Sequence, residues 1–356
     1  MNRKSLSLPL TFTVALFTVF LYFCPDISPE KYWYMAFLPF LIPLMWVLNL
    51  ILLAFWGWRK SWYALIPILI LAGGFKYFLR TYQLDWSESK AKKDFSVVSY
   101  NVRVFNSYAH LADKGYASSK KMIKWLKENP ADVLCLQEFI VYESMPMFRT
   151  VDIIKTKHPY VHVNYFYEAN NDVKIGMAIF SKFPIINKGA IRFRERTNNN
   201  VIYADLKIGN DTVRVYNMHL QSMSIDEQEL AGQDFDSTYR SRLVKVMLKY
   251  RRGAIMRSKQ VQRLLDHMNS CPYRIVLCGD LNETPYTYSY EKFRDRMDNA
   301  YEEEGNGFGF TYNGALFFLR IDNIFTDKEL EVLRYKVHRD ITWTDHFPVS
   351  TDLKMK

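Results

Sequence analysis

Three long apolar runs near the N-terminus limit what this chain can fold into more than any other feature. They extend over Leu6 to Cys24, Tyr32 to Trp58 and Trp62 to Leu79. Only short polar breaks separate them. A helix rises about 1.5 Å per residue, so about 20 residues cross a hydrocarbon layer of about 30 Å. Each run therefore predicts a membrane-spanning helix, and we place the three spans at about 6–24, 34–56 and 62–79.

The first run has a second interpretation, as a cleaved signal peptide. Asn2-Arg3-Lys4 supplies a basic start, and Leu6 to Phe23 supplies an apolar middle. No pattern of small residues that marks a cleavage site follows, whereas two further apolar runs do. We therefore favour an uncleaved anchor. Five tryptophans, which cluster mainly near the ends of the predicted helices, fit the aromatic belts of membrane proteins. They are Trp33, Trp46, Trp56, Trp58 and Trp62.

The charges that flank the spans give a divided answer on orientation. Arg3 and Lys4 before the first span, with Arg59 and Lys60 before the third, favour a cytoplasmic N-terminus. An odd number of spans then places the rest of the chain outside the cytoplasm. The opposite orientation is favoured by a basic cluster at the far end of the third span, namely Lys76, Arg80, Lys90, Lys92 and Lys93. Since long domains cross membranes largely regardless of charge, we expect the outside placement.

The composition changes after Leu84. Hydrophobic residues make up 49% of the whole chain but are concentrated in residues 1–84, the predicted anchor. Residues 85–94 are polar and predict a linker, and residues 95–356 predict one domain. Its expected strands are Phe95 to Tyr100, Val133 to Leu136, Met177 to Phe180, Val201 to Ile208, Val213 to Met218 and Ile275 to Cys278. Helices are expected at Ser118 to Glu128 and Arg240 to Met268, so the domain is a layered α/β structure.

Net charge and cysteine content say little about the binding partners of this protein or its cellular compartment. The formal net charge of +10 favours anionic partners. Of the four cysteines, Cys24 falls in a predicted span, and Cys135 and Cys278 fall in predicted buried strands. No framework of disulfides is predicted from this arrangement.

Polar and acidic residues follow apolar strands at several places, as they do in active sites built at the edge of a sheet. The segments are Ser99-Tyr100-Asn101-Val102, Leu136-Gln137-Glu138, Tyr216-Asn217-Met218-His219-Leu220, Cys278-Gly279-Asp280-Leu281-Asn282, Arg320-Ile321-Asp322-Asn323-Ile324 and Trp343-Thr344-Asp345-His346-Phe347-Pro348. Their order and spacing resemble the endonuclease/exonuclease/phosphatase family, as does the segment from Ile175 to Ile185. The resemblance covers about Phe95 to Leu353. It implies a deoxyribonuclease I-like four-layer α/β/β/α sandwich, here preceded by three transmembrane helices, in a membrane-anchored bacterial type of the family.

The chemistry that these residues suit is phosphate-ester hydrolysis. It requires neutralised phosphoryl oxygens, a positioned water and a stabilised leaving oxygen. Mg²⁺, or Mn²⁺, suits the first task, because it binds carboxylate, water and phosphate oxygens. Glu138, a lone carboxylate directly after an apolar run, is our first choice for a metal ligand; the alternative is an exposed loop glutamate. Asn101 is expected to orient the metal or contact substrate, and Asp345 to be a further ligand.

Five residues are predicted to be catalytic. Asp280 and Asn282 are two positions apart, so both point the same way in an extended segment, although Gly-Asp-x-Asn alone is more often a plain turn. The resemblance implies that Asp280 deprotonates the attacking water and that Asn282 donates to the phosphoryl charge. His346 is predicted to contact or protonate a phosphoryl oxygen, with Asp322 on its other ring nitrogen. His219 is predicted to approach the same phosphate from another strand.

Two further residues are predicted to bind substrate, Asn217 and Arg103. Arg103 stands where nucleases of the family often carry an acidic residue, two positions after the asparagine. The departure puts a second metal position in doubt, and we expect one metal. Because guanidinium binds phosphate in a bidentate manner, Arg103 is instead a candidate phosphate clamp.

The predicted helix from Arg240 is strongly basic. Nine Lys or Arg and no Asp or Glu occur between Arg240 and Arg263, interleaved with apolar residues. This pattern is typical of amphipathic surfaces that bind anionic lipid or nucleic acid, and also of a solvated helix face. An acidic stretch from Asp226 to Asp236 precedes it and partly offsets its charge.

Together these features predict a membrane-bound, Mg²⁺- or Mn²⁺-dependent phosphoric ester hydrolase, integral to the bacterial inner membrane with its catalytic domain outside. Nuclease-like phosphodiesterase activity is the first expectation, with in-line attack by an activated water. Phospholipid or sphingolipid phosphodiesterase and inositol-phosphate phosphatase are the alternatives. A non-catalytic membrane-bound interaction protein is an alternative of another class, which the complete set of polar residues disfavours. No protein partner can be inferred. A transporter is disfavoured, because the spans contain no central ionisable residue.

Overall fold

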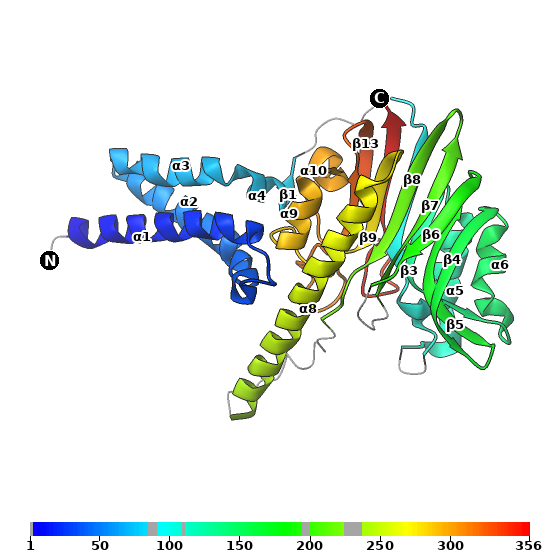
Figure 1. Ribbon diagram of the computed structural model, residues 1–356. Coiled ribbons are helices and arrows are strands. Elements are labelled where there is room, and N and C mark those ends of the chain that lie inside the picture. Colours follow the sequence, from blue (N-terminus) through cyan, green and yellow to red (C-terminus); the bar gives the residue numbers. More distant parts are fainter. Residues whose placement is uncertain (1–2, 85–90, 109–110, 194–198, 224–236) are drawn as a thin grey trace.

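The structure is a computed structural model that describes residues 3–84, 91–108, 111–193, 199–223 and 237–356. A group of N-terminal helices projects from one side of a sandwich of two sheets (Figure 1). The C-terminus lies at one end of the sandwich, far from the N-terminus. Six of the ten residues of the predicted linker, 85–90, lie outside the described residues, as does the whole acidic stretch from Asp226 to Asp236.

The N-terminal helices correspond only in part to the predicted spans. The helices are α1 (Arg3–Phe23), α2 (Ile42–Trp58), α3 (Leu65–Gly73) and α4 (Phe75–Leu79), with short 3₁₀ turns η1 (Cys24–Asp26), η2 (Trp33–Ala36), η3 (Leu38–Leu41) and η4 (Trp62–Ala64). Two stretches, Ser7–Asp26 and Trp33–Trp58, are long and apolar enough to cross a membrane. A signal sequence near the N-terminus passes the same test.

The third predicted span differs from the expectation of one helix over 62–79. Its apolar helical stretch, Trp62–Gly73, is shorter than a span, and α4 has only five residues. The break falls at Gly74, where an added Cβ would come within 2.1 Å of the Tyr22 side chain. Glycine is thus needed for the close approach of α1, and the prediction of three spans is supported for two of them.

Polar side chains join α1 to α2 inside the helical group. The Asn49 amide donates to the Thr18 hydroxyl at 3.0 Å, and the Trp56 indole N–H donates to the Thr11 hydroxyl at 2.9 Å. Such hydrogen bonds hold helices together where the surroundings offer no water. The first helix is therefore an integral part of this group.

Two six-stranded sheets form the sandwich. The order in the first is β13-β14-β2-β3-β5-β4, and in the second β10-β12-β9-β8-β7-β6. The bounds in the first are β2 (Phe95–Asn101), β3 (Val133–Tyr142), β4 (Tyr160–Ala169), β5 (Val173–Ser181), β13 (Leu330–Val337) and β14 (Val349–Met355). In the second they are β6 (Ile185–Ile191), β7 (Asn200–Ile208), β8 (Asp211–His219), β9 (Arg274–Asp280), β10 (Asp298–Asn299) and β12 (Asp322–Thr326). The neighbours β2 and β3, and likewise β8 and β9, run parallel, so their carboxyl ends meet.

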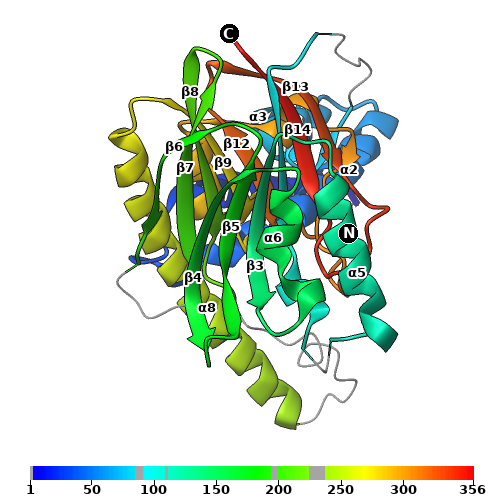
Figure 2. The ribbon, with the colours of Figure 1, turned by 90° about the vertical axis from the view of Figure 1, so that its right-hand side faces the viewer.

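Helices cover the outer faces of both sheets, which completes the four layers (Figure 2). The helices are α5 (Ala117–Glu128) and α6 (Thr150–Lys155) on the first sheet, and α8 (Ser237–Asn269) and α9 (Tyr288–Arg294) on the second. The remaining elements are α10 (Ala300–Glu304), β11 (Gly307–Phe308), η5 (Arg103–Asn106), η6 (Lys114–Tyr116) and η7 (Pro146–Phe148).

Successive strand residues face opposite layers. In β2, Val97 packs between the sheets, whereas Val98 packs toward α5. Three separate apolar cores fill the gaps between the layers, and the core under α8 includes Leu264 and Leu277. The α/β/β/α arrangement predicted from the sequence is therefore confirmed.

The helical group is docked on the sandwich and does not hang from it on a free tether. Arg80, which follows α4, forms two hydrogen bonds of 2.8 Å with Glu291 of α9, and both side chains are buried. Arg320 donates to the Arg80 carbonyl at 3.1 Å. The short strand β1 (Tyr82–Gln83) pairs with β11. These contacts fix how the sandwich faces the apolar helices.

Candidate active site

The predicted site residues gather at one edge of the sandwich, where β2, β8 and β9 end, β12 begins and β3 is irregular. In the first sheet, Asn101 at the end of β2 pairs in register with Gln137 of β3. In the second, Asp280 of β9 pairs with both His219 of β8 and Asp322 of β12. Because parallel neighbours end at the same edge, residues far apart in sequence lie together there.

One carboxylate oxygen lies at the centre of this group. Oδ2 of Asp280 accepts from the Asn101 amide at 3.2 Å and lies 3.7 Å from Nε2 of His219 and 3.8 Å from Nε2 of His346. Glu138, from the first sheet, contacts two of these three partners. Its Oε1 lies 3.2 Å from the Asn101 amide nitrogen and 3.8 Å from Nε2 of His219. The site thus spans both sheets.

Glu138 is aimed into the site by an irregularity in β3. The register between β3 and β5 shifts between Leu136 and Phe139, and Glu138 has a φ of 51°. A bulge adds a residue to one strand and redirects a side chain, often beside an active site. A positive φ in a residue other than glycine is uncommon and costs free energy, so surrounding contacts must hold it in place.

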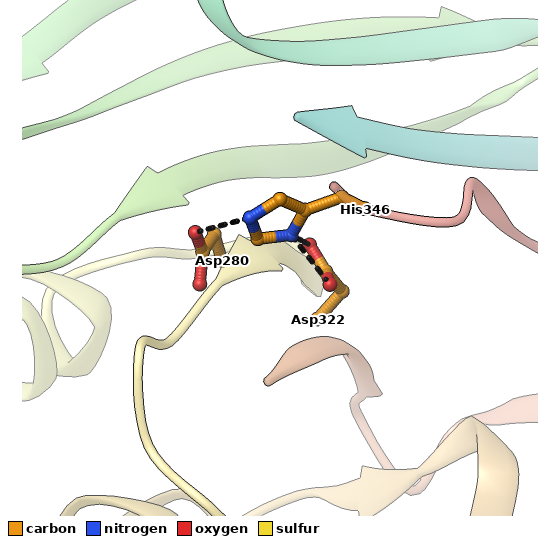
Figure 3. A group of neighbouring side chains, drawn as sticks. All are labelled: Asp280, Asp322 and His346. Carbon is orange, nitrogen blue, oxygen red and sulfur yellow. Dashed lines mark hydrogen bonds and ion pairs between the residues drawn. The ribbon is translucent and has the colours of Figure 1, made fainter. Parts of the chain in front are cut away.

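His346 sits between two carboxylates (Figure 3). Its Nδ1 donates to Asp322, with separations of 2.9 and 3.1 Å from the two carboxylate oxygens, while Nε2 faces Asp280. One ligand atom from each of the three residues lies within 4.8 Å of the others. Since Asp322 already occupies Nδ1, this cluster fits an oriented acid–base pair better than it fits a metal centre.

The two histidines of the site differ in pKa direction. Burial lowers the pKa of His219, and the nearby Asp280 only partly opposes this effect. Burial also acts to lower the pKa of His346, but the Asp322 and Asp280 carboxylates outweigh it and raise that pKa well above its ordinary value. Burial raises the pKa of both Asp280 and Glu138. Near neutral pH the site therefore combines an imidazolium with a neutral imidazole.

Asn282 and the backbone orient Asp280. The Asn282 backbone N–H donates to Oδ1 of Asp280 at 2.8 Å, which leaves Oδ2 to face the rest of the site. The Asn282 amide donates to the Leu220 carbonyl at 3.1 Å, and the residue has a φ of 54°. Asn282 is thus part of a turn that fixes the orientation of the Asp280 carboxylate.

Arg103 and Asp345 form an ion pair at the rim of the site. Nε of Arg103 lies 3.2 Å from Oδ2 of Asp345, and the arginine side chain is 40% exposed. The other carboxylate oxygen, Oδ1 of Asp345, is buried and has no hydrogen-bond partner among the described residues. Arg103 therefore neutralises a predicted metal ligand while its guanidinium stays accessible to an anion.

Asn217 is placed differently from what was predicted for a substrate-binding residue. It is fully buried, and its amide donates to the Leu136 and Ala178 carbonyls at 3.0 Å each. Its oxygen accepts from the Gln137 amide at 2.6 Å. All of its hydrogen-bonding groups in the side chain join one sheet to the other, so none is directed to a substrate. This assignment is corrected: Asn217 ties the sheets together beneath the site.

The replacement Asn217→Leu should therefore act on stability. It leaves two buried carbonyls without their donor, which costs about 1–3 kcal/mol of the free energy of unfolding. Denaturant titration with steady-state kinetics would check it: we expect a lower midpoint and an unchanged KM. Asn210→Leu, in the exposed turn between β7 and β8, is the matched control. A raised KM with unchanged stability would restore the substrate-binding role.

The residues present fit a hard divalent cation. Glu138 is part-exposed, and its Oε1 shares the Asn101 amide with Asp280. The unpartnered Oδ1 of Asp345 is a further oxygen without a proton donor. Carboxylate oxygens are ligands that Mg²⁺ and Mn²⁺ prefer. The Asn101 amide differs from the expectation for a ligand, because it turns its nitrogen to Glu138 and Asp280 while its oxygen accepts from the Arg103 backbone N–H at 3.1 Å. The carboxylate oxygens thus suit a hard divalent cation.

Several supporting residues escaped the sequence analysis. The Thr344 hydroxyl accepts from the His346 N–H at 3.1 Å and donates to the His346 carbonyl at 2.9 Å, which fixes the loop that carries the histidine. Arg257 of α8 pairs with Glu283 at 2.9 Å and donates to the Gln221 carbonyl at 2.6 Å. Thr344 lies inside the segment from Trp343 to Pro348, so its place beside Asp345 and His346 could have indicated a supporting role. Nothing in the spacing of Arg257 links it to Glu283.

A prominent surface hollow lies elsewhere. Its volume is about 720 Å³, and its lining includes Asp211 and Arg274, at the starts of β8 and β9. His219 and Asp280 stand at the opposite ends of these strands. The candidate site is therefore defined by its converging side chains, and not by the size of a cavity.

Two family models match separate parts of the chain. A model described as the endonuclease/exonuclease/phosphatase family matches residues 98–346, which is more than half of the sequence. A second, described as a domain of unknown function, matches residues 3–81. No protein with curated annotation matches the chain in sequence.

Solved structures share the fold of the sandwich. An endonuclease/exonuclease/phosphatase from Beutenbergia cavernae DSM 12333 has a TM-score of 0.55 at 15% identity, covering 74% of this chain and 72% of that one. A family protein from Leptotrichia buccalis C-1013-b has a TM-score of 0.51 at 14% identity, covering 73% and 100%. The human Nocturnin catalytic domain with bound sulfate has a TM-score of 0.50 at 17% identity, covering 74% and 96%. At such identities the likeness shows the fold alone.

Proposed function

Because this chain belongs to the endonuclease/exonuclease/phosphatase family, we propose that it is a metal-dependent hydrolase of phosphate esters whose active site is the sheet edge around Asp280. The observation that carries the proposal is the position of one carboxylate oxygen. Oδ2 of Asp280 faces the Asn101 amide and both histidines at once, while its other oxygen is held by a backbone N–H. A water placed beside Oδ2 would meet a base and proton donors together.

In the proposed reaction, a water attacks phosphorus from the side opposite the leaving group. Asp280 accepts a proton from this water during the attack. Its raised pKa brings it closer to that of an effective base at neutral pH. His346, kept as an imidazolium by Asp322, stabilises the negative charge that develops on a phosphoryl oxygen or gives up its Nε2 proton. His219, with Nε2 3.7 Å from Oδ2 of Asp280, is proposed as a further donor. Asn282 gives one amide N–H to the Leu220 carbonyl, and its second amide N–H is the proposed donor to the phosphoryl charge.

Glu138 is the proposed metal ligand, with the side chains of Asn101 and Asp345 beside it. When bound, Mg²⁺ or Mn²⁺ supplies neutralisation of phosphoryl and leaving-group oxygens. Arg103 pairs with Asp345 at the rim, where its accessible guanidinium suits a phosphate oxygen. We propose a single metal position, because residue 103 is an arginine and not the carboxylate that a second metal ion would need.

For the substrate, we propose a phosphodiester, with nuclease-like activity first. A lipid phosphodiester is the second candidate, and the observation that favours it is the pair of apolar stretches long enough to cross a membrane. We also propose residues 1–84 as a retained anchor, with the sandwich outside the cytoplasm of a bacterial cell. The Asn49 to Thr18 hydrogen bond, which ties the first helix to the second, supports retention.

A hydrolysis panel on the purified full chain in detergent tests this proposal. The substrates are plasmid DNA, RNA, bis-p-nitrophenyl phosphate, p-nitrophenyl phosphate, sphingomyelin and inositol phosphates, each with Mg²⁺, Mn²⁺ or EDTA. We expect diesters to be cleaved faster than monoesters and EDTA to abolish turnover. Turnover that resists EDTA would contradict the metal requirement. Silence across every substrate and metal would favour a non-catalytic interaction protein.

A further inference from the structure

The N-terminal half of α8 carries an apolar face that nothing in the described residues covers. Leu243, Val244, Met247 and Leu248 are each 40–55% exposed. Leu243 and Met247 are four residues apart, as are Val244 and Leu248, which places all four on one side of the helix. Lone exposed apolar residues are ordinary, but a contiguous group of this kind on one helix face marks a surface that binds something apolar.

Positive charge borders this apolar face. Lys245 and Arg252 are exposed and lie on the neighbouring side of the same helix, Lys245 between Val244 and Met247 and Arg252 one turn beyond Leu248. From Ser241 to Arg263 the helix contains no acidic side chain. An amphipathic helix with apolar residues on one face and Lys and Arg beside them lies at the surface of a bilayer, where its charges meet anionic headgroups.

The apolar face continues directly into the candidate membrane-spanning group. Tyr250, one turn beyond Met247, donates its hydroxyl proton to the Ala36 carbonyl at 2.9 Å. Its ring lies 4.4 Å from that of Phe37, centroid to centroid. The Arg251 guanidinium lies 4.9 Å from the Trp33 ring centroid. The segment η2 to η3 that makes these contacts directly precedes α2, at the end of the apolar helices that faces the sandwich.

The direction of α8 agrees with these contacts. In Figure 1 its N-terminal half, yellow-green, slants out of the sandwich and back toward the side on which α1 and α2 lie. The buried pair of Arg80 and Glu291 holds the sandwich against the helical group, so this direction is fixed relative to the apolar helices. A bilayer crossed by α1 and α2 would therefore meet the first turns of α8.

We propose that residues 243–252 of α8 lie in the headgroup region of a bilayer that contains anionic lipids. The occupant of the apolar face is the lipid surface itself, because the face is continuous with the membrane-spanning group and is bordered by cations. The same helix carries Arg257, which holds the Gln221 carbonyl and Glu283 beside the candidate site. The docked helix would thus fix how the site is presented to the membrane. This inference requires that α1 and α2 cross the membrane, and it does not depend on catalysis.

An environment-sensitive fluorophore on the full chain in lipid nanodiscs tests the proposal. The probe is attached at Met247→Cys, with Gln262→Cys as the matched control on the exposed C-terminal half of the same helix. Both carry Cys271→Ser, because the other three cysteines are buried. In discs that contain phosphatidylglycerol we expect a blue shift, quenching by nitroxide-labelled lipid and protection from iodide at position 247 only. The charge reversals Lys245→Glu and Arg252→Glu should together reduce the shift.

Three outcomes would overturn the proposal. The first is iodide quenching of the Met247→Cys probe equal to that of the Gln262→Cys probe in phosphatidylglycerol discs. The second is an identical shift in discs of phosphatidylcholine alone, which would remove the role of anionic lipid. The third is a shift that duplex DNA or RNA produces and anionic lipid does not, which would assign the surface to nucleic acid.

Discussion

The replacement Asp280→Asn should reduce turnover by at least ~10²-fold while the domain stays folded, as expected for a lost general base. The change keeps the size of the side chain, and its oxygen can still accept from the backbone N–H that holds Oδ1. An amide cannot take the proton of the attacking water. The companion change His346→Ala removes the imidazolium and should cause a loss of similar size.

Steady-state kinetics on bis-p-nitrophenyl phosphate at saturating metal, with a thermal melt of each variant, measures this effect. Asp266→Asn on the exposed face of α8 is the matched control and should retain wild-type turnover. Near-normal turnover in both Asp280→Asn and His346→Ala would show that the chemistry is performed elsewhere. A loss that accompanies unfolding would be separated from a catalytic loss by the melt.

The second large effect concerns stability. Arg257 is fully buried and is paired with Glu283, which is 5% exposed. The replacement Arg257→Met leaves the Glu283 carboxylate buried without a partner, which costs about 3–5 kcal/mol. Because Glu283 follows Asn282 in the turn that holds Asp280, turnover should fall as well. The double replacement with Glu283→Gln should recover part of the stability, since no buried charge is left.

A thermal melt of the full chain in detergent provides the measurement. The control is Arg263→Met, an exposed arginine on the same helix, which should change stability by no more than about 0.5 kcal/mol. Equal melting temperatures for Arg257→Met and Arg263→Met would mean that the buried pair contributes nothing. In that case α8 would not be the support of the Asp280 turn.

The sequence predicted the architecture because its signals are local. Apolar runs with β-branched residues marked the strands, and a polar residue after the run marked the carboxyl end of β2, β8 and β9. The strand predicted from Val133 to Leu136 in fact continues to Tyr142. The prediction stopped too early because the bulge at Gln137 and Glu138 interrupts the alternating pattern of the strand. The polar pair looked like the end of a strand, although it is an irregularity within one.

What the sequence could not reveal depends on tertiary contacts. Asn217 stands in the same strand as His219, two positions earlier, so the two point the same way. Nothing in the sequence shows that the sandwich closes over Asn217 and leaves His219 at its rim. Likewise, the need for glycine at position 74, where the helix breaks, follows from the approach of Tyr22, which is 52 positions earlier in the chain. A hydropathy average describes one segment alone, so it does not detect a contact between two segments such as that of Tyr22 with Gly74.

The most direct test of the central claim is divalent-cation binding, because it needs no knowledge of the substrate. Electron paramagnetic resonance of Mn²⁺, titrated with the full chain, measures free and bound ion. We expect the wild-type chain to bind Mn²⁺, Mg²⁺ to displace it, and Glu138→Gln to weaken the binding strongly. Glu143→Gln, an exposed glutamate just beyond the same strand, is the matched control and should bind as the wild type does. Equal binding by the wild type and Glu138→Gln, or no binding by either, would contradict a metal-dependent site at this sheet edge.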